Sequence, residues 1–252
     1  MRTLKEVMAL LDATLEPWRF QDYCPNGLQV EGSAHVKRIV TGVTASQALI
    51  DAAIAHKADA IVVHHGYFWK GEDACVTGLK KQRLSKLLAH DISLFAYHLP
   101  LDAHPELGNN AQLAKQFGWR REGSLMPTHP QGLGDIATLD APVSVEEFSQ
   151  RIAKVLGRNP QVIAAGPERI QRIAWCTGAA QNYIDKAIAL GLDAYISGEI
   201  SEPTVHSARE DGIHYFACGH HATERYGVRA LGEYIQEKLG IAVEFVDIDN
   251  PV

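Results

Sequence analysis

The chain has 252 residues, of which 46% are hydrophobic and 21% charged, and its formal net charge is −6. This composition is typical of a globular protein with a substantial core, and the acidic balance argues against a general affinity for nucleic acid or acidic membranes. No apolar run approaches the roughly 18 residues of a membrane-spanning helix, and the N-terminus does not have the pattern of a signal peptide, so we expect a cytoplasmic protein.

The N-terminal segment predicts an amphipathic helix over residues 4–15. Its apolar residues recur at spacings of three and four, and Thr3 with Glu6 has the arrangement of a capping box at the helix start. A turn and a short alternating strand are expected next, at 25–32.

A strand at 39–43, a helix at 46–56 and a strand at 60–65 predict a βαβ unit. The second strand ends in His64 and His65, and a glycine follows them. Neighbouring side chains of a regular strand point to opposite faces, but at a strand end that opens into a glycine loop two adjacent histidines can bind two metal ions. In an open α/β sheet, the carboxyl ends of the strands are also where ligands bind.

A second set of polar groups follows a second strand. A helix at 83–90 leads to a strand at 92–97, and His98 and Asp102 come directly after it. The segment 123–143 is rich in Gly, Pro and Thr and has little periodicity, so it predicts a linker or a long surface connection.

The first βαβ pattern then recurs at an offset of 134 residues, with Arg38 matched by Arg172 and Asp59 by Asp193. Two copies of one unit predict an α/β protein with two similar halves. We expect these halves to be residues 1–125 and 126–252, with the metal site at their junction.

The second half does not repeat the paired histidines. Gly198 and Glu199 stand at the position of the first pair, and a new polar group, His220 to Glu224, follows a later strand and opens a helix that should run to about Leu239. His220 and Glu224 are four residues apart, so on a helix they share a face, which is a metal-binding arrangement.

Five residues at strand ends, or in the first turn after one, are candidate metal ligands. One metal ion can take His64 and Asp102 and a second His65 and His220, with Glu224 bridging the two. Mixed imidazole and carboxylate ligands suit Zn, Mn, Fe, Co or Ni. Two such divalent ions lower the pKa of a bound water and leave a positive site for phosphates, so the expected chemistry is hydrolysis.

Two further residues are candidates for supporting roles. Glu199 is a candidate acid or base, or a group that orients a ligand; a capping or salt-bridged glutamate is the alternative. His98 could hydrogen-bond to a ligand, with a structural role as the alternative, and the same choice applies to His206 and His221. The sequence contains no P-loop, no Rossmann fingerprint and no serine nucleophile elbow.

Several motifs, taken with their joint spacing, carry a resemblance over nearly the whole length. They are PNGLQVEG at 25–32, HHG at 64–66, HLPLD at 98–102, SGE at 197–199 and GHHATE at 219–224.

These motifs resemble the signatures of the Nif-three-like family, also called type 2 homologues of GTP cyclohydrolase I, and are most similar to its YbgI branch. The resemblance implies two similar, intertwined α/β domains in αβα layers, a dinuclear metal site and a toroidal homohexamer. The ligand positions of the family match, residue by residue, the same five positions: His64, His65, Asp102, His220 and Glu224.

Two functions follow as hypotheses. The first is a metal-dependent hydrolase acting on a nucleotide such as GTP or on a related anionic small molecule. The alternative is a non-catalytic metal-binding protein, either a regulatory or scaffold ring or a metal carrier. Turnover of a nucleotide panel that depends on His64 would separate the two.

Overall fold

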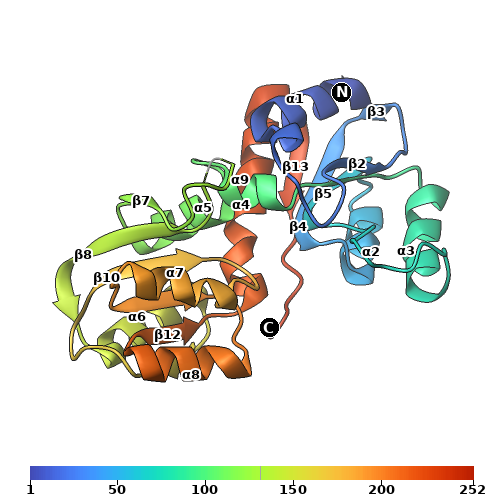
Figure 1. The fold of residues 1–252 in the computed structure, drawn as a ribbon. Helices are drawn as coiled ribbons and strands as arrows, with labels where there is room; N and C mark the ends of the chain where they lie inside the picture. The colour runs from blue at the N-terminus through green and yellow to red at the C-terminus, as the bar shows by residue number, and fades with distance from the viewer. Residues whose placement is uncertain (131) are drawn as a thin grey trace. The chain divides into compact units, whose positions relative to one another are not determined.

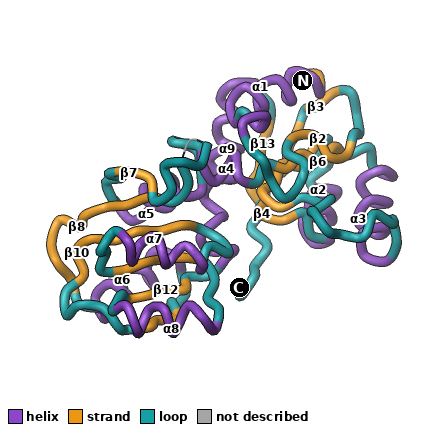
Figure 2. The backbone as a smooth tube through the Cα atoms, viewed as in Figure 1, coloured by secondary structure: helices purple, strands orange, loops and turns teal. Residues whose placement is uncertain are grey.

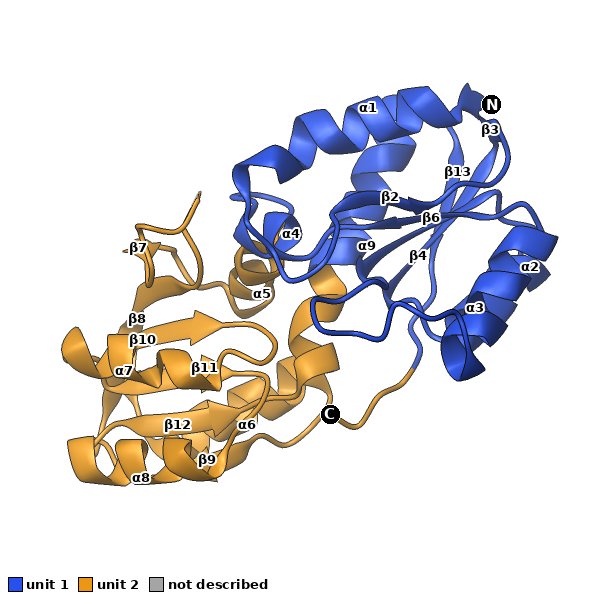
Figure 3. Ribbon diagram, turned by 45° about the vertical axis from the view of Figure 1, so that its right-hand side comes forward, with its two compact units in different colours: residues 1–107, 227–248 blue, residues 108–226, 249–252 orange. Residues whose placement is uncertain are grey.

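The computed structural model describes residues 1–130 and 132–252, and it divides into two compact units (Figure 3). Unit 1 comprises residues 1–107 and 227–248, and unit 2 comprises 108–226 and 249–252. The halves expected from the sequence are continuous stretches, whereas each unit combines two stretches, because one long helix begins in unit 2 and continues in unit 1.

Unit 1, which carries both the N-terminal helix and the later turns of α9 (Figure 1), is built on a five-stranded sheet with the order β13-β4-β5-β6-β2. The first four of these strands run parallel, and β2 is antiparallel to β6. A two-stranded antiparallel pair, β1 with β3, lies beside the first helix. The strands of unit 1 are β1 (Arg2–Thr3), β2 (Gly27–Val30), β3 (His35–Val36), β4 (Arg38–Thr44), β5 (Ala60–His65), β6 (Ser93–Ala96) and β13 (Ala242–Phe245).

Helices cover both faces of this sheet (Figure 2). On one face, apolar residues of α1 and α9 pack against alternate residues of the central strands, such as Val62 and Phe95. On the other face, α2 and α3 pack against the intervening residues, such as Ile61 and Val63. The helices are α1 (Leu4–Leu15), η1 (Pro17–Arg19), α2 (Gln47–Ala55), α3 (Gly78–Ala89), α4 (Leu99–Ala103) and the later turns of α9 (His220–Leu239).

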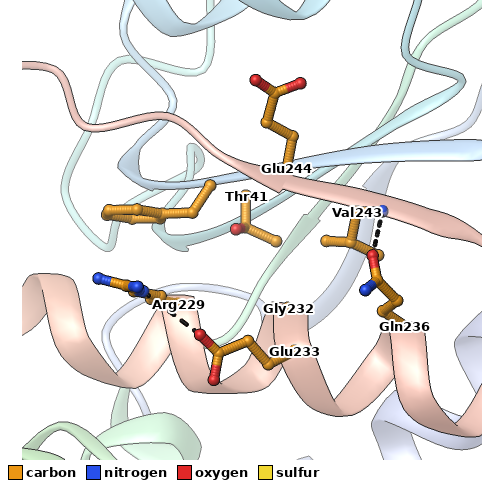
Figure 4. Close-up of a pocket in the computed structure, with 8 residues that line it drawn as sticks. Thr41, Arg229, Gly232, Glu233, Gln236, Val243 and Glu244 are labelled. Atoms are coloured by element: carbon orange, nitrogen blue, oxygen red, sulfur yellow. Dashed lines mark hydrogen bonds and ion pairs between the residues drawn. The ribbon is translucent and has the colours of Figure 1, made fainter.

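Gly232 allows α9 to lie close to the sheet of unit 1 (Figure 4). A Cβ on Gly232 would come within 3.0 Å of the Thr41 side chain and 3.2 Å of Val243. One turn further on, the Gln236 side chain accepts a hydrogen bond from the backbone N–H of Val243. At 20 residues α9 is the longest described helix, yet no described helix is both long and apolar enough to cross a membrane.

Unit 2 is built on a six-stranded sheet with the order β7-β8-β10-β11-β12-β9, in which β10, β11 and β12 run parallel. Its core joins α5 and α6 to one face of the sheet. Its elements are α5 (Asn109–Phe117), β7 (Gly123–Ser124), β8 (Asp135–Val143), α6 (Val145–Leu156), β9 (Gln161–Ile163), β10 (Ile170–Cys176), η2 (Gln181–Tyr183), α7 (Ile184–Ala189), β11 (Ala194–Ser197), α8 (Glu202–Asp211) and β12 (His214–Ala217).

The internal repeat is visible in the strand registers. Ile39 of β4 pairs with Ala60 of β5, and Ile173 of β10 pairs with Ala194 of β11, which is the same pairing 134 residues later. Both copies therefore place a parallel β-α-β-α-β run at the centre of a sheet. The expectation of a mixed α/β protein is confirmed.

Two expectations about individual elements were wrong. The segment 123–143 contains the strands β7 and β8 rather than only a linker; residue 131 lies outside the described part. Pro142 and the exposed polar residues Thr138 and Asp140 weaken the strand signal of β8, as is common at the margin of a sheet. The helix expected at 83–90 begins earlier, at Gly78. Its first turn is exposed and lacks apolar periodicity, so the sequence pattern did not reveal this start.

Candidate metal centre

The paired histidines lie at the end of β5, and the Nδ1 atom of each ring is within hydrogen-bond distance of another residue of the protein. Nδ1 of His64 lies 3.0 Å from the backbone oxygen of Tyr97, and Nδ1 of His65 lies 3.0 Å from the Thr44 hydroxyl. Their ring centroids are 4.4 Å apart, and His64 is fully buried. Metal-binding histidines are commonly oriented in this way, through a hydrogen bond to the nitrogen that does not bind the metal.

Asp102 and His98 join the paired histidines in unit 1. Asp102 lies in α4, the short helix after β6, and its Oδ1 is 3.5 Å from Nε2 of His64. One ring nitrogen from each of His64, His65 and His98 lies within 4.8 Å of the other two. Unit 1 thus gathers three imidazoles and one carboxylate, and such a cluster could hold a metal ion.

His98 is held by a residue that the sequence patterns did not single out. Its Nδ1 lies 2.7 Å from Oδ1 of Asp22, whose other oxygen accepts hydrogen bonds from the backbone of Leu99 and the side chain of Asn26. Burial alone would raise the pKa of Asp22, but the hydrogen bond and the charge of His98 outweigh it and lower the pKa. Asp22 therefore fixes the orientation of the His98 ring.

In unit 2 the candidate ligands are His220 and Glu224, at the start of α9. Nε2 of His220 lies 3.0 Å from Oε2 of Glu224, one helical turn away, and its Nδ1 lies 2.6 Å from Oε1 of Glu199. Glu199 follows β11, at the position that corresponds to His65 in the repeat. Burial by itself lowers the pKa of His220, but the two carboxylates overcome this and raise it to about 9.

The donor groups fit divalent transition metals. In both units an imidazole Nδ1 is engaged by a protein oxygen while Nε2 is directed toward a carboxylate, as in the pairs His64 with Asp102 and His220 with Glu224. Gly178 packs directly against Glu224, and any side chain at this position would overlap the carboxylate. Imidazole with carboxylate is a donor set suited to Zn, Mn, Fe, Co and Ni.

Other histidines have structural surroundings. His206 forms an exposed ion pair with Glu202, one turn earlier on α8. His104 accepts hydrogen bonds at Nδ1 from the backbone N–H groups of Glu106 and Leu107, which stabilise the turn after α4. Neither residue belongs to the clusters that could hold a metal ion within unit 1 or unit 2.

The profile of the Duf34/NIF3 (NGG1p interacting factor 3) family matches residues 2–251. A Pseudomonas aeruginosa protein named GTP cyclohydrolase 1 type 2 homolog is 58% identical over 240 residues, covering 95% of each chain. A Vibrio cholerae protein of the same name is 56% identical over 249 residues, covering 98% of each chain.

Solved structures agree with this match. A protein titled ybgI, of unknown function, is 52% identical and superimposes with a TM-score of 0.95 over 99% of this chain and 100% of its own. A protein from Thermus thermophilus is 31% identical, with a TM-score of 0.89 over 99% of this chain and 100% of its own.

Proposed function

Because this chain belongs to the Duf34/NIF3 family, we propose that His64, His65, Asp102, His220 and Glu224 together bind two divalent metal ions and that the protein is a metal-dependent hydrolase. The proposed substrate is a nucleotide such as GTP, or a related anionic small molecule. The name shared by the similar proteins from Pseudomonas aeruginosa and Vibrio cholerae supports this substrate class.

One observation carries the proposal: both sets of ligand residues have the same internal arrangement. In each, a protein oxygen engages Nδ1 of a histidine, and Nε2 of that histidine is directed toward a carboxylate. A metal ion binds a deprotonated nitrogen and an anionic oxygen in close proximity, so in this arrangement it would take the place of the proton between Nε2 and the carboxylate. We propose that Glu224 bridges the two ions.

When bound, two divalent ions would supply a water of lowered pKa and positive charge to stabilise the transition state. The protein's own residues hold the geometry. Glu199 accepts a hydrogen bond from Nδ1–H of His220 and orients its ring, and Asp22 does the same for His98. We propose His98 and Glu199 as orienting residues, with Glu199 also a candidate to accept a proton from substrate.

The ligand set is tested by metal analysis of the purified full chain. We expect two divalent ions per chain in the wild type, and loss of at least one in each of His64→Ala, Asp102→Ala and Glu224→Gln. His206→Ala, which removes a histidine from an exposed ion pair, is the matched control and should retain both ions. Wild-type stoichiometry in all three ligand variants would refute the metal centre.

The reaction is tested by incubating the metal-loaded protein with a panel of nucleotides, using Mn, Zn and Fe in turn. We expect turnover that is lost in His64→Ala and retained in His206→Ala. If both ions bind but no nucleotide is hydrolysed, the hydrolase proposal fails, and a metal-binding regulatory, scaffold or carrier role takes its place.

We further propose that the chain assembles as a homohexamer, as its resemblance to the YbgI branch implies. Light scattering on the protein as it elutes from a size-exclusion column measures the mass directly. One chain has a mass of 27.6 kDa, and a monomer or dimer at micromolar concentration would overturn this proposal.

A further inference from the structure

Unit 2 contains a pocket of about 520 Å³ that none of the candidate metal ligands lines. It is lined by residues from the end of α5 and the segment that follows, from β8 and from α6. Pockets that bind small organic molecules have about 300–1,000 Å³, with an aromatic or apolar lining and a few polar groups. The size of this pocket is therefore suited to one small ligand.

The floor of the pocket is aromatic. Phe117 and Trp119 are stacked in parallel, with ring centroids 4.2 Å apart and an interplanar angle of 9°. Trp119 also stacks on Phe148 of α6, at 5.9 Å and 21°. Phe148 is buried in the core of unit 2, whereas Phe117 and Trp119 are only partly buried. The floor thus presents apolar, flat surface that the core does not fully cover.

Positive charge surrounds this floor. Arg120 follows Trp119, and Arg151 and Lys154 lie three residues apart on the same face of α6. Among the residues that the structure describes, neither the Arg151 nor the Lys154 side chain has a hydrogen-bond or ion-pair partner. Asp140 of β8 is the acidic residue in the lining. Arg120 pairs with Glu122 at 3.6 Å. Arg151 and Lys154 against Asp140 therefore leave the excess of positive charge, which favours an anionic ligand.

We propose that this pocket binds a small aromatic anion, that is, a flat ring bearing a carboxylate or phosphate group. The ring contacts the surface of Phe117 and Trp119, and the anionic group lies near Arg151 and Lys154. The site lies outside the metal centre, so the proposal does not depend on the hydrolase function.

Calorimetric titration of the metal-loaded full chain with two matched probes tests the charge requirement. 1-Naphthoate carries the ring and the anion, and 1-naphthamide is its neutral counterpart. We expect naphthoate to bind more tightly, and its affinity to fall as salt is added, because exposed charges are screened. Equal affinities for the two probes, or no binding of either, would overturn the proposal.

Variants that remove either positive or negative charge from the lining locate the site, because they should change naphthoate affinity in opposite directions. Removing an exposed cation partner costs about two- to fivefold in affinity, so Arg151→Gln with Lys154→Gln should weaken naphthoate binding about tenfold. Asp140→Asn should tighten it about twofold, and both changes should leave naphthamide binding unaltered. Arg209→Gln, on α8 of the same unit, is the control and should change neither probe.

Tryptophan fluorescence provides a readout for the aromatic floor. Naphthoate should quench the emission of the wild type, and Trp119→Phe should remove most of that quenching, while Trp18→Phe retains it. Quenching that persists in Trp119→Phe, or naphthoate affinity that is unchanged in the Arg151/Lys154 double variant, would place the probe elsewhere and refute the proposal.

Discussion

Gly178 lies directly against Glu224: a Cβ on Gly178 would be 2.1 Å from Oε1 of the carboxylate and 3.1 Å from Nε2 of His220. Gly178→Ala should therefore displace both candidate ligands and lower metal content in the purified protein. Its backbone has φ +71°, so an alanine also costs about 1 kcal/mol of stability.

Gly157→Ala is the matched control for this change. Gly157 has a similar φ of +74° at the end of α6, but nothing lies within 4 Å of its Cβ position. It should show only the backbone part of the stability loss, about 1 kcal/mol, with full metal content. Equal metal content in the two variants would mean that Glu224 and His220 do not bind metal where we propose.

Thr44→Val should weaken metal binding without reducing stability much. The Thr44 hydroxyl lies 3.0 Å from Nδ1 of His65 and orients that ring. Losing such a partner typically lowers metal affinity about 10- to 100-fold. Competition with a chelator of known affinity measures the change, and an unaltered dissociation constant would contradict the assignment of His65.

Thr41→Val, on the same strand, should change stability and leave metal binding unaltered. The Thr41 hydroxyl is buried and makes no hydrogen bond to any residue in the described part of the chain. Replacing it with a methyl group removes the desolvation cost of an unsatisfied hydroxyl, so stability should rise by about 1 kcal/mol with unchanged metal binding. Urea unfolding measures the difference.

His220 should titrate at unusually high pH in the metal-free protein. Its pKa is raised from 6.5 to about 9, so the stability that its charged form contributes is complete below pH 6.5 and lost as the pH rises through 9. Proton NMR of the imidazole should give a midpoint near 9, and Glu199→Gln should lower it. Glu202→Gln, the partner of His206, should leave it unchanged; a wild-type midpoint near 6.5 would refute the prediction.

Thr3→Ala should destabilise the protein by about 1 kcal/mol. The Thr3 hydroxyl accepts a hydrogen bond from the backbone N–H of Glu6 and so completes the capping box of α1. Thr77 stands at the start of α3 without a side-chain capping bond, so Thr77→Ala serves as the control and should have little effect. Thermal unfolding of the two variants compares them directly, and equal melting temperatures would show that the cap is not stabilising.

Local signals predicted the elements that depend on local physics. The capping box at Thr3 and the unbroken β-branched run before His64 needed only neighbouring residues, and the structure has both elements. β8 could not be recognised in this way, because its stability comes from pairing with β10, about 30 residues further along the chain, as Arg172 pairs with Thr138. Long-range pairing leaves little trace in local composition.

The candidate site shows the same division. Residues with metal-binding chemistry at strand ends stand out in the sequence, and within unit 1 the structure gathers His64, His65 and Asp102. Their supporting partners, Asp22 and Thr44, have no such signal, because a single hydrogen bond to a distant ring defines each role. At the offset of 134 residues Thr44 corresponds to Gly178, so both copies of the repeat place this position beside a candidate metal ligand.

The division of unit 1 into 1–107 and 227–248 has a consequence for synthesis of the chain. A ribosome completes nearly all of unit 2 before the later turns of α9 and the strand β13 emerge. Until then the sheet of unit 1 is incomplete. One face of it stays exposed to solvent, namely the face that Val228, Leu231 and Ile235 cover in the folded protein. Premature termination anywhere before residue 227 leaves that sheet uncovered, so truncated products should be prone to aggregation and degradation.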